Sequence, residues 1–376
     1  MTKILVILVT VTLLAYLSQQ QSLKYTQGDG RKHWDIYLII LFIFLVLLAG
    51  LRTSYNDTVA YAAGYNQSVT ITEFFKDSTN LELLHNPLFY GFQALVKTFT
   101  NNVNVFFMIC AVIVNYFNIK FIKRTVDVQD FAFSMFLYVS LGTLMLSLGA
   151  QKQTLAMSVI TVAITQLFDK KYVKYYIIVF LAGLIHSYAW LFLFLPLLDC
   201  KPWSLRTYIL LFSTMFVMYT FQSTISSLIE VADQVGKNIS VKEVFDGNQM
   251  NIFRVLVYSV VPMIALIFKD RINSNIDRKH SILIQMSTVS LMFMMMGTMN
   301  GANMFGRSGN YFEIGYICSL VWIVRKLFTK QSVSIVLIIA TICFAGFYMY
   351  DNQTFQYEYR NKSITRFIAE VVRSDS

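Results

Sequence analysis

Three cations stand at the ends of long apolar stretches in this chain: Arg52, Lys152 and Arg307. A charge close to the apolar interior of a membrane is costly, about 2.5–3.5 kcal/mol at the centre of a span, so such a residue points to a function. Arginine can hold a phosphate through two parallel hydrogen bonds. Glycines flank Arg307 within 306–309, and they let a ligand approach the backbone closely. Together these cations suit the binding of an anion such as a lipid-linked diphosphate.

Two further side chains can accept or donate a proton. His186 stands in the pair His186-Ser187 between two apolar runs, and Asp57 follows Arg52 closely. Histidine titrates near neutral pH, and either group can take a proton from a hydroxyl. Simpler alternatives stay open: a buried His186 bonded to backbone, an Asp57 that caps a helix, and cations at ordinary helix ends and turns. Arg254 is a weaker binding candidate, because it starts an apolar helix at the membrane interface.

Membrane helices must position these residues. Apolar residues make up 56% of the 376 residues and charged residues 14%, whereas a soluble domain carries about 25% charge. One crossing needs about 20 apolar residues, so the sequence predicts an all-α, polytopic membrane helical bundle with about 11–12 membrane helices. We expect a single transmembrane domain over 1–350 and a short extracytoplasmic tail over 351–376. The predicted helices are 3–18, 34–51, 103–121, 131–149, 153–168, 171–186, 188–200, 206–224, 252–268, 281–298, 308–326 and 333–350.

Two stretches do not fit a simple series of spans. Residues 70–100 carry too many charges to cross, and we expect amphipathic helices that lie on the outer surface there. Residues 171–200 are too short for two straight crossings of about 20 residues each. They should form a hairpin of short helices with its tip at His186-Ser187, and a tip inside the bilayer must face protein or water.

Lysine and arginine gather in the connectors that follow helices 103–121, 153–168, 252–268 and 308–326. By the positive-inside rule these four connectors should be cytoplasmic. The loops 52–102 and 225–251 are then outside. Arg52, Lys152, Arg307 and His186 would face one cavity that opens away from the cytosol. The net charge of +10 is accounted for in this way, and we expect no nucleic-acid partner.

No pattern indicates a metal or another cofactor. The four histidines are scattered, and the four cysteines form no Cys-x-x-Cys pair, so a zinc site is not expected. No group of carboxylates offers a site for Mg²⁺.

The order of several short motifs resembles one known family. The motifs are Gly-Leu-Arg with Asn-Asp and a tyrosine over 50–61, Asn86-Pro87-Leu88-Phe89, Gln151-Lys152-Gln153, His186-Ser187, and Arg307-x-x-x-Tyr311-Phe312. In this order, over roughly residues 35–325, they resemble the EpsG/Wzy-type polymerases of bacterial exopolysaccharide and capsule synthesis. Two departures matter. Lys152 stands where the family often has arginine, and Asn86 stands where it often has glutamate, so that His85 could partly replace the acid.

The resemblance implies a mechanism at the outer face of the bacterial plasma membrane. Undecaprenyl-diphosphate-linked oligosaccharide units are joined when a sugar hydroxyl of one unit attacks the anomeric carbon of another, and the lipid diphosphate leaves. Arg52 and Arg307 would bind the diphosphate, with Lys152 and Gln153 in support, and His186 or Asp57 would be the base. Tyr61, His85, Tyr311 and Arg254 would contact substrate. Besides donor, acceptor and membrane lipid, a chain-length regulator and a flippase are possible partners.

Two other functions stay open. A flippase or transporter of lipid-linked sugars would use the same cations without bond chemistry, although the chain lacks the internal repeats common in transporters. A membrane glycosyltransferase that adds one sugar would have a similar site. An O-acyltransferase would need a catalytic histidine that faces a cytoplasmic cofactor, and His186 is predicted on the outer side. The length of the product separates a polymerase from a single-addition enzyme.

Overall fold

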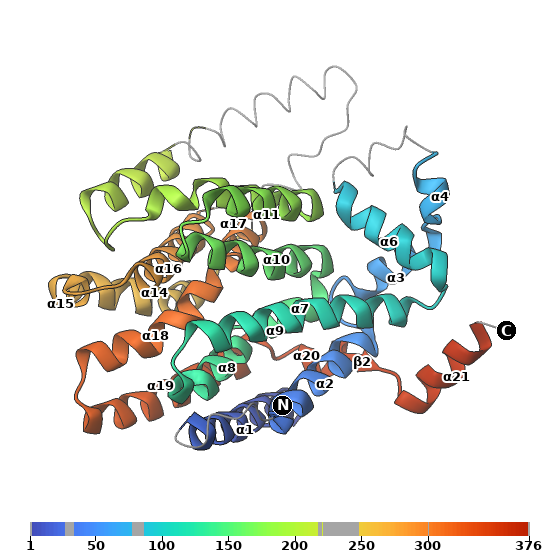
Figure 1. Cartoon of the computed structure of the whole chain (residues 1–376), viewed down its shortest axis with the longest axis horizontal. Coiled ribbons are helices and arrows are strands. Elements are labelled where there is room, and N and C mark those ends of the chain that lie inside the picture. Colours follow the sequence, from blue (N-terminus) through green and yellow to red (C-terminus); the bar gives the residue numbers. More distant parts are fainter. Residues whose placement is uncertain are drawn as a thin grey trace. The chain divides into compact units, whose positions relative to one another are not determined.

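The computed structural model describes residues 2–26, 34–76, 86–216, 220, 248–299 and 301–374 (Figure 1). His85 and most of the loop 225–251, both predicted to contact substrate, lie outside the described residues. The chain divides into two compact units. Unit 1 comprises Met1–Leu193 and Ile338–Ser376, and unit 2 comprises Phe194–Leu337. The expectation of a single domain stays a prediction, and each unit is described by itself.

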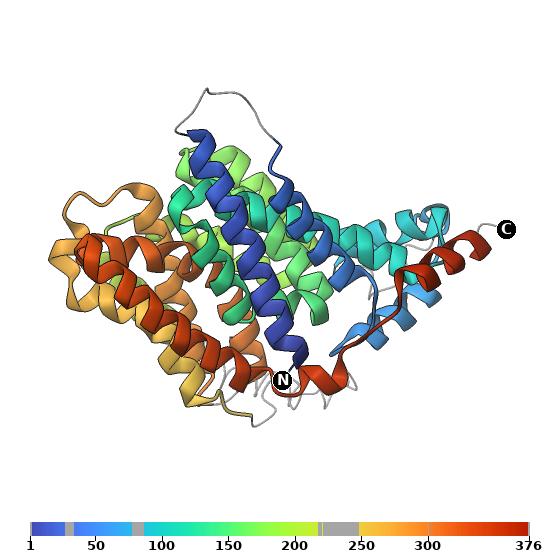
Figure 2. The same cartoon turned by 90° about the horizontal axis from the view of Figure 1, so that it is seen from below.

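Unit 1 is a helical bundle built around α7 (Val103–Thr125) and α10 (Gln151–Phe168). α2 (Ile36–Gly50) packs against α7, and α7 and α11 (Tyr172–Ile185) pack against α10. The helix α1 (Thr2–Thr26) packs against α2 and α8, and its N-terminal end lies beside α20 (Figure 2). The remaining elements are β1 (Arg52–Ser54), α3 (Thr58–Gln67), α4 (Ile71–Phe74), α6 (Pro87–Phe99), η1 (Val128–Asp130), α8 (Phe131–Ser140), α9 (Thr143–Gly149), α20 (Phe355–Glu358), β2 (Arg360–Asn361) and α21 (Ile364–Ser374).

Local sequence explains where the main helices of unit 1 begin and end. The Asp35 side chain accepts a hydrogen bond from the Leu38 amide at the start of α2, and Asn102 caps α7 in the same way. These caps satisfy amides that have no partner within the helix. Lys123 and Arg124 lie in the last turn of α7, where positive charge is favourable. The predicted helix 131–149 is instead two helices, α8 and α9, bent by 47° at Gly142, which has a positive φ of 101°.

The predicted hairpin is present as α11 followed by the 3₁₀ helix η2 (Ser187–Leu198). The two arms run back along each other: the Tyr175 hydroxyl donates to the Phe192 carbonyl, and Gly183 lies directly against the Trp190 ring. A 3₁₀ helix rises about 2.0 Å per residue and an α-helix about 1.5 Å. The 12 residues of η2 and the 14 of α11 therefore reach about 24 Å and about 21 Å, so two short arms have matching lengths.

Unit 2 is arranged around α16 (Arg278–Met296), which packs against α14 (Ile252–Ile267), α17 (Ala302–Asn310) and α18 (Glu313–Leu327). A Cβ atom at Gly315 would lie 2.5 Å from the Leu283 carbonyl, so this glycine allows α18 to pack closely on α16. Arg278 starts α16 and forms an ion pair with Asp199 at 2.5 Å. The other described helices are Leu205–Phe216, α15 (Lys269–Asn273) and the first part of α19 (Lys330–Asp351).

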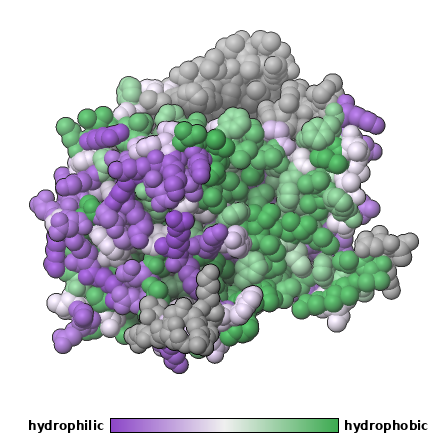
Figure 3. Space-filling model, viewed as in Figure 1, coloured by the Kyte–Doolittle hydropathy of each residue, from purple (hydrophilic) through white to green (hydrophobic). Residues whose placement is uncertain are grey.

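The predicted all-α membrane bundle is confirmed. Three described helices are long and apolar enough to cross a membrane, Thr2–Tyr25, Val103–Thr125 and Lys330–Asp351. The bent pair Val128–Ser140 and Thr143–Gly149 makes a fourth if it forms one broken span. Several of the other predicted spans correspond to apolar helices of 10–17 residues. Large exposed apolar side chains cover α6, α7 and α21 of unit 1 on the face shown in Figure 3. Such an exposed apolar surface is expected of a protein that lipid surrounds.

Candidate active site

The helices of unit 1 run between two ends of the bundle, and these two ends carry different polar residues. α2 and α7 are antiparallel, because Asn104 Nδ2 at the start of α7 donates to the carbonyls of Gly50, at the end of α2, and of Arg52, just beyond it. At their other ends Lys123 forms an ion pair with Asp35 at 2.7 Å. We call the first the Arg52 end. The second is the basic end, and it carries Lys120, Lys123, Arg124, Lys170, Lys171 and Lys174.

Arg52 lies in the protein interior and is only 1% exposed. One terminal nitrogen of its guanidinium donates to the Ala49 carbonyl, and the other donates to Gln151 Oε1 at 2.7 Å. The charge lies over the Phe107 ring, 4.2 Å from its centroid. Burial lowers the pKa of Arg52 to about 10, so the side chain is still charged at neutral pH. Arg52 thus ties the end of α2 to the first residue of α10.

Lys152 follows Gln151 in the first turn of α10 and reaches toward α3 and α6. Its Nζ lies 3.3 Å from the Tyr90 hydroxyl and 5.7 Å from the Phe89 ring centroid. Its backbone amide donates to the Tyr61 hydroxyl at 3.3 Å. The N-terminus of an α-helix carries a partial positive charge and free amides. Lys152, two tyrosine hydroxyls and this helix end therefore form a site suited to an anion.

The segment that carries Asp57 packs against the break between α9 and α10. A Cβ atom at Gly149 would lie 2.9 Å from the Asn56 side chain, and Thr58 Oγ1 donates to the Leu148 carbonyl at 3.3 Å. Asp57 itself is exposed, and its side chain makes no capping hydrogen bond to α3. The structure therefore brings Arg52, Asp57, Tyr61 and Lys152 together from three elements.

His186 ends α11 at the tip of the hairpin and is half-buried. Its amide bonds back to the Ala182 carbonyl at 3.0 Å, and its ring meets the Tyr188 ring at 5.1 Å. α11 returns along α10 after the short connector 169–171 and also packs against α6. The start of α10 and the end of α11 are thus at the same end of unit 1, so His186 belongs to the Arg52 end. Gln153 lies one residue beyond Lys152 but is buried, 2% exposed.

The C-terminal segment that contains β2 also belongs to the Arg52 end, which the sequence did not predict. β2 pairs antiparallel with β1, so Arg52 lies opposite Asn361. The Tyr359 hydroxyl donates to the Leu48 carbonyl at 2.7 Å, and the Lys362 amide donates to the Leu51 carbonyl at 3.0 Å. A pairing of two short strands, more than 300 residues apart, leaves no periodic signal that a sequence reading could detect.

The other predicted site residues belong to unit 2. Arg307 is exposed and lies in the last turn of α17, a separate short helix, rather than at the start of the predicted helix 308–326. Tyr311 is buried in the turn between α17 and α18. Arg254 lies in the first turn of α14, as predicted, and is partly buried. That these residues meet the Arg52 end stays a prediction. Among the described residues, no group of three or more His, Cys, Asp or Glu side chains is placed to hold a metal ion.

The comparison with protein families confirms the resemblance that the sequence motifs indicated. The EpsG family matches residues 35–364. The chain belongs to the EpsG family. No curated protein and no solved structure gives a significant match. Membership of the EpsG family supports a polysaccharide polymerase in general, and the apolar helices support a multi-pass membrane protein. The matched range begins just before α2 and ends at the first residue of α21, so it includes the β1–β2 pair.

Proposed function

We propose that this EpsG protein joins undecaprenyl-diphosphate-linked oligosaccharide units into a polymer on the outer face of the plasma membrane. In each step a sugar hydroxyl of the acceptor attacks the anomeric carbon of the donor. A new glycosidic C–O bond forms, the bond from the anomeric carbon to the diphosphate oxygen breaks, and the hydroxyl proton passes to a base. The lipid diphosphate leaves with the bonding electron pair.

The observation that carries this proposal is the cluster of Lys152, Tyr61 and Tyr90 at the start of α10. A leaving diphosphate gains negative charge as its bond breaks, and fixed positive groups stabilise that charge most in the transition state. Lys152 Nζ and the helix N-terminus supply positive charge, and two tyrosine hydroxyls can add hydrogen bonds, without a metal ion. The aromatic rings of Tyr61 and Tyr90, which are both partly exposed and pack against the buried Phe89, offer surfaces on which sugar rings can stack.

In this proposal Arg52 supports the site instead of binding the diphosphate, which was the role expected from the sequence. The residue is only 1% exposed, and its guanidinium donates to the Ala49 carbonyl and Gln151 Oε1, so in this proposal it does not contact the diphosphate directly. It holds Gln151, and hence the start of α10, in place, and it adds positive charge beneath the site. Arg307 stays the predicted diphosphate ligand, Tyr311 and Arg254 stay predicted substrate contacts, and His186 or Asp57 would accept the hydroxyl proton.

The outward orientation rests on the charges of unit 1. Lysine and arginine crowd the short connectors of the basic end, whereas the described stretch 52–76 at the Arg52 end carries two cations, Arg52 and Lys76, and two acids, Asp57 and Glu73. The positive-inside rule then favours a cytoplasmic basic end and an extracytoplasmic Arg52 end. This orientation suits substrates that have already been flipped to the outer leaflet.

Reconstitution of the full chain in vesicles with a lipid-linked repeat unit tests the proposal. Wild-type protein should give a ladder of products on a gel, whereas a single added unit would favour a single-addition transferase, and no bond formation would favour a transporter. Arg307→Ala should abolish the ladder without loss of folding. His186→Ala should slow the reaction at least a hundredfold if it is the base, and a rate within a few-fold of wild type would assign the proton to another group.

A further inference from the structure

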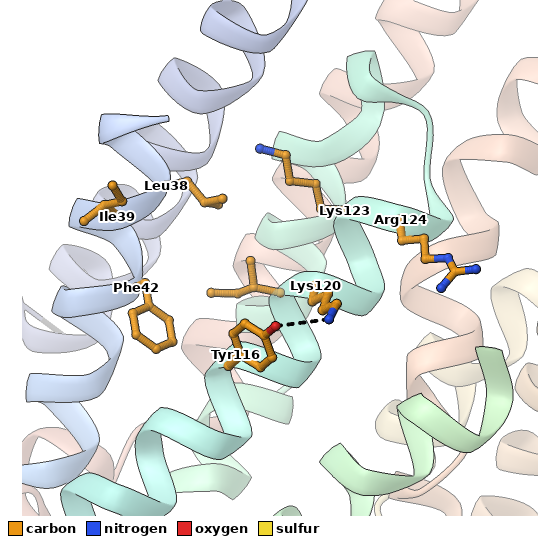
Figure 4. Close-up of a pocket in the computed structure, with 8 residues that line it drawn as sticks. Leu38, Ile39, Phe42, Tyr116, Lys120, Lys123 and Arg124 are labelled. Atoms are coloured by element: carbon orange, nitrogen blue, oxygen red, sulfur yellow. Dashed lines mark hydrogen bonds between the residues drawn. The ribbon is translucent and has the colours of Figure 1, made fainter. Parts of the chain in front are cut away.

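A groove opens between α2 and α7 at the basic end of unit 1. It has a volume of about 520 Å³, within the range of about 300–1,000 Å³ that holds one bound small molecule. Its walls are apolar, and its cations all come from the last turns of α7 (Figure 4). The residues that line it are Leu38, Ile39, Phe42, Tyr116, Ile119, Lys120, Lys123 and Arg124.

The three cations of this groove differ in what they already bind. Lys123 is paired with Asp35 at 2.7 Å. Lys120 is exposed and donates to the Tyr116 hydroxyl at 3.0 Å, and within the described part of the chain it forms no ion pair. Arg124 is 59% exposed and reaches Asp169 only at 3.8 Å. Lys120 and Arg124 are thus the cations best able to bind an additional anion.

A second, smaller groove lies on the other side of α7, against α10. It has a volume of about 170 Å³, and its lining is mixed: Phe117, Phe121 and Val162 are apolar, whereas Thr161, Thr165 and Gln166 are polar. Lys120 and Arg124 line this groove as well. The two cations therefore lie between an apolar groove on one side of α7 and a partly polar groove on the other.

We propose that an anionic glycerophospholipid binds at the basic end of unit 1, with its phosphate between Lys120 and Arg124 and its acyl chains in the apolar groove between α2 and α7. α7 meets the length and hydropathy of a membrane span, so the grooves lie at the depth of lipid chains and the cations near the headgroups. A basic site between membrane helices is suited to anionic headgroups. A charged peptide or a nucleic acid would leave the apolar walls uncovered. This site is separate from the Arg52 end, and the inference does not depend on the proposed polymerase activity.

Lipid binding to the purified full chain tests this site. The protein, in zwitterionic detergent, is titrated with phosphatidylglycerol or with phosphatidylcholine of the same acyl chains, and bound lipid is counted by native mass spectrometry. Phosphatidylglycerol should bind at least about tenfold more tightly, since each nearby lysine or arginine contributes about 1 kcal/mol to an anionic lipid. The double variant Lys120→Gln/Arg124→Gln should weaken phosphatidylglycerol binding by about 25-fold, or about fivefold for each charge.

Two further variants separate this site from general charge attraction. Lys174→Gln removes a cation from the same end that lines neither groove, and it should leave the affinity unchanged. Leu38→Trp keeps every charge but fills the larger groove, and it should weaken binding by at least about fivefold. Equal affinity for both lipids, or a double variant that binds like wild type, would overturn the proposal. Displacement of phosphatidylglycerol by a lower concentration of undecaprenyl diphosphate would reassign the groove to an isoprenoid lipid.

Discussion

At the scale of single residues, Arg52 and Lys152 are close in space but have different surroundings, and their variants should behave differently. Arg52→Ala leaves the Ala49 carbonyl and Gln151 Oε1 buried without a donor. Each unsatisfied acceptor costs about 1–3 kcal/mol, so the free energy of unfolding should fall by about 2–6 kcal/mol. Thermal unfolding of the detergent-solubilised protein measures this change. An Arg52→Ala protein as stable as wild type, yet inactive, would instead assign Arg52 to direct diphosphate binding.

Lys152 should matter for catalysis far more than for stability. It is partly exposed, and its ammonium makes a single weak hydrogen bond, to Tyr90 at 3.3 Å. Lys152→Ala should therefore unfold at nearly the wild-type temperature but lower the polymerisation rate by about 10²–10³-fold, the usual effect of removing one transition-state charge. Lys152→Arg keeps the charge and should restore most of the rate. Lys174→Ala, at the basic end, is the matched control, and an equal loss there would indicate a general effect of charge.

At the scale of elements, the hairpin of α11 and η2 depends on one close contact. A Cβ atom at Gly183 would lie 2.4 Å from Trp190 Cε2, so Gly183→Ala forces the two arms apart. Overpacking of this kind costs about 1–3 kcal/mol, and we expect a lower unfolding temperature and a slower reaction, because the tip at His186 moves. Adding Trp190→Leu should rescue both. Gly346→Ala, where nothing lies within 4 Å, should be neutral.

The C-terminal segment should divide into an essential and a dispensable part. Deleting residues 355–376 removes β2 and the bonds from Tyr359 and Lys362 to α2, so Arg52 loses its strand partner and activity should be lost. Deleting residues 363–376 removes only α21 and the ion pairs of Glu370. These ion pairs lie within the C-terminal segment itself and do not involve Arg52 or α2, so this shorter deletion should keep most of the rate. Polymerisation assays on the two truncated proteins make the comparison, and equal activity would contradict a role for β2.

At the scale of the whole molecule, apolar runs and their lengths predicted the helices, whereas contacts between distant residues could not be predicted from the sequence. Long apolar runs predicted the helical membrane bundle, and the short stretch 171–200 predicted the hairpin. The bend at Gly142 and the separate helix α17 depend on tertiary packing that periodicity does not encode. The burial of Arg52 could not be foreseen, because Gln151 and Phe107, which surround it, are distant in sequence. Tyr61 and Lys152, distant in sequence, are joined by a hydrogen bond in unit 1, and their sharing of a catalytic site with Asp57 stays a prediction.

The orientation of unit 1 in the membrane gives the last prediction. Gln67 lies at the end of α3, on the side of the Arg52 end, and Asp127 lies just past the C-terminus of α7, at the basic end; both are exposed. With Cys200 and Cys343 replaced by serine, a membrane-impermeant thiol reagent applied to intact cells should label Gln67→Cys. It should label Asp127→Cys only after the membrane is opened. The other two native cysteines, Cys110 and Cys318, are buried, so background labelling should be low. Reversed labelling would place Lys152 on the cytosolic side, where flipped lipid-linked sugars are absent, and the proposed reaction could not take place there.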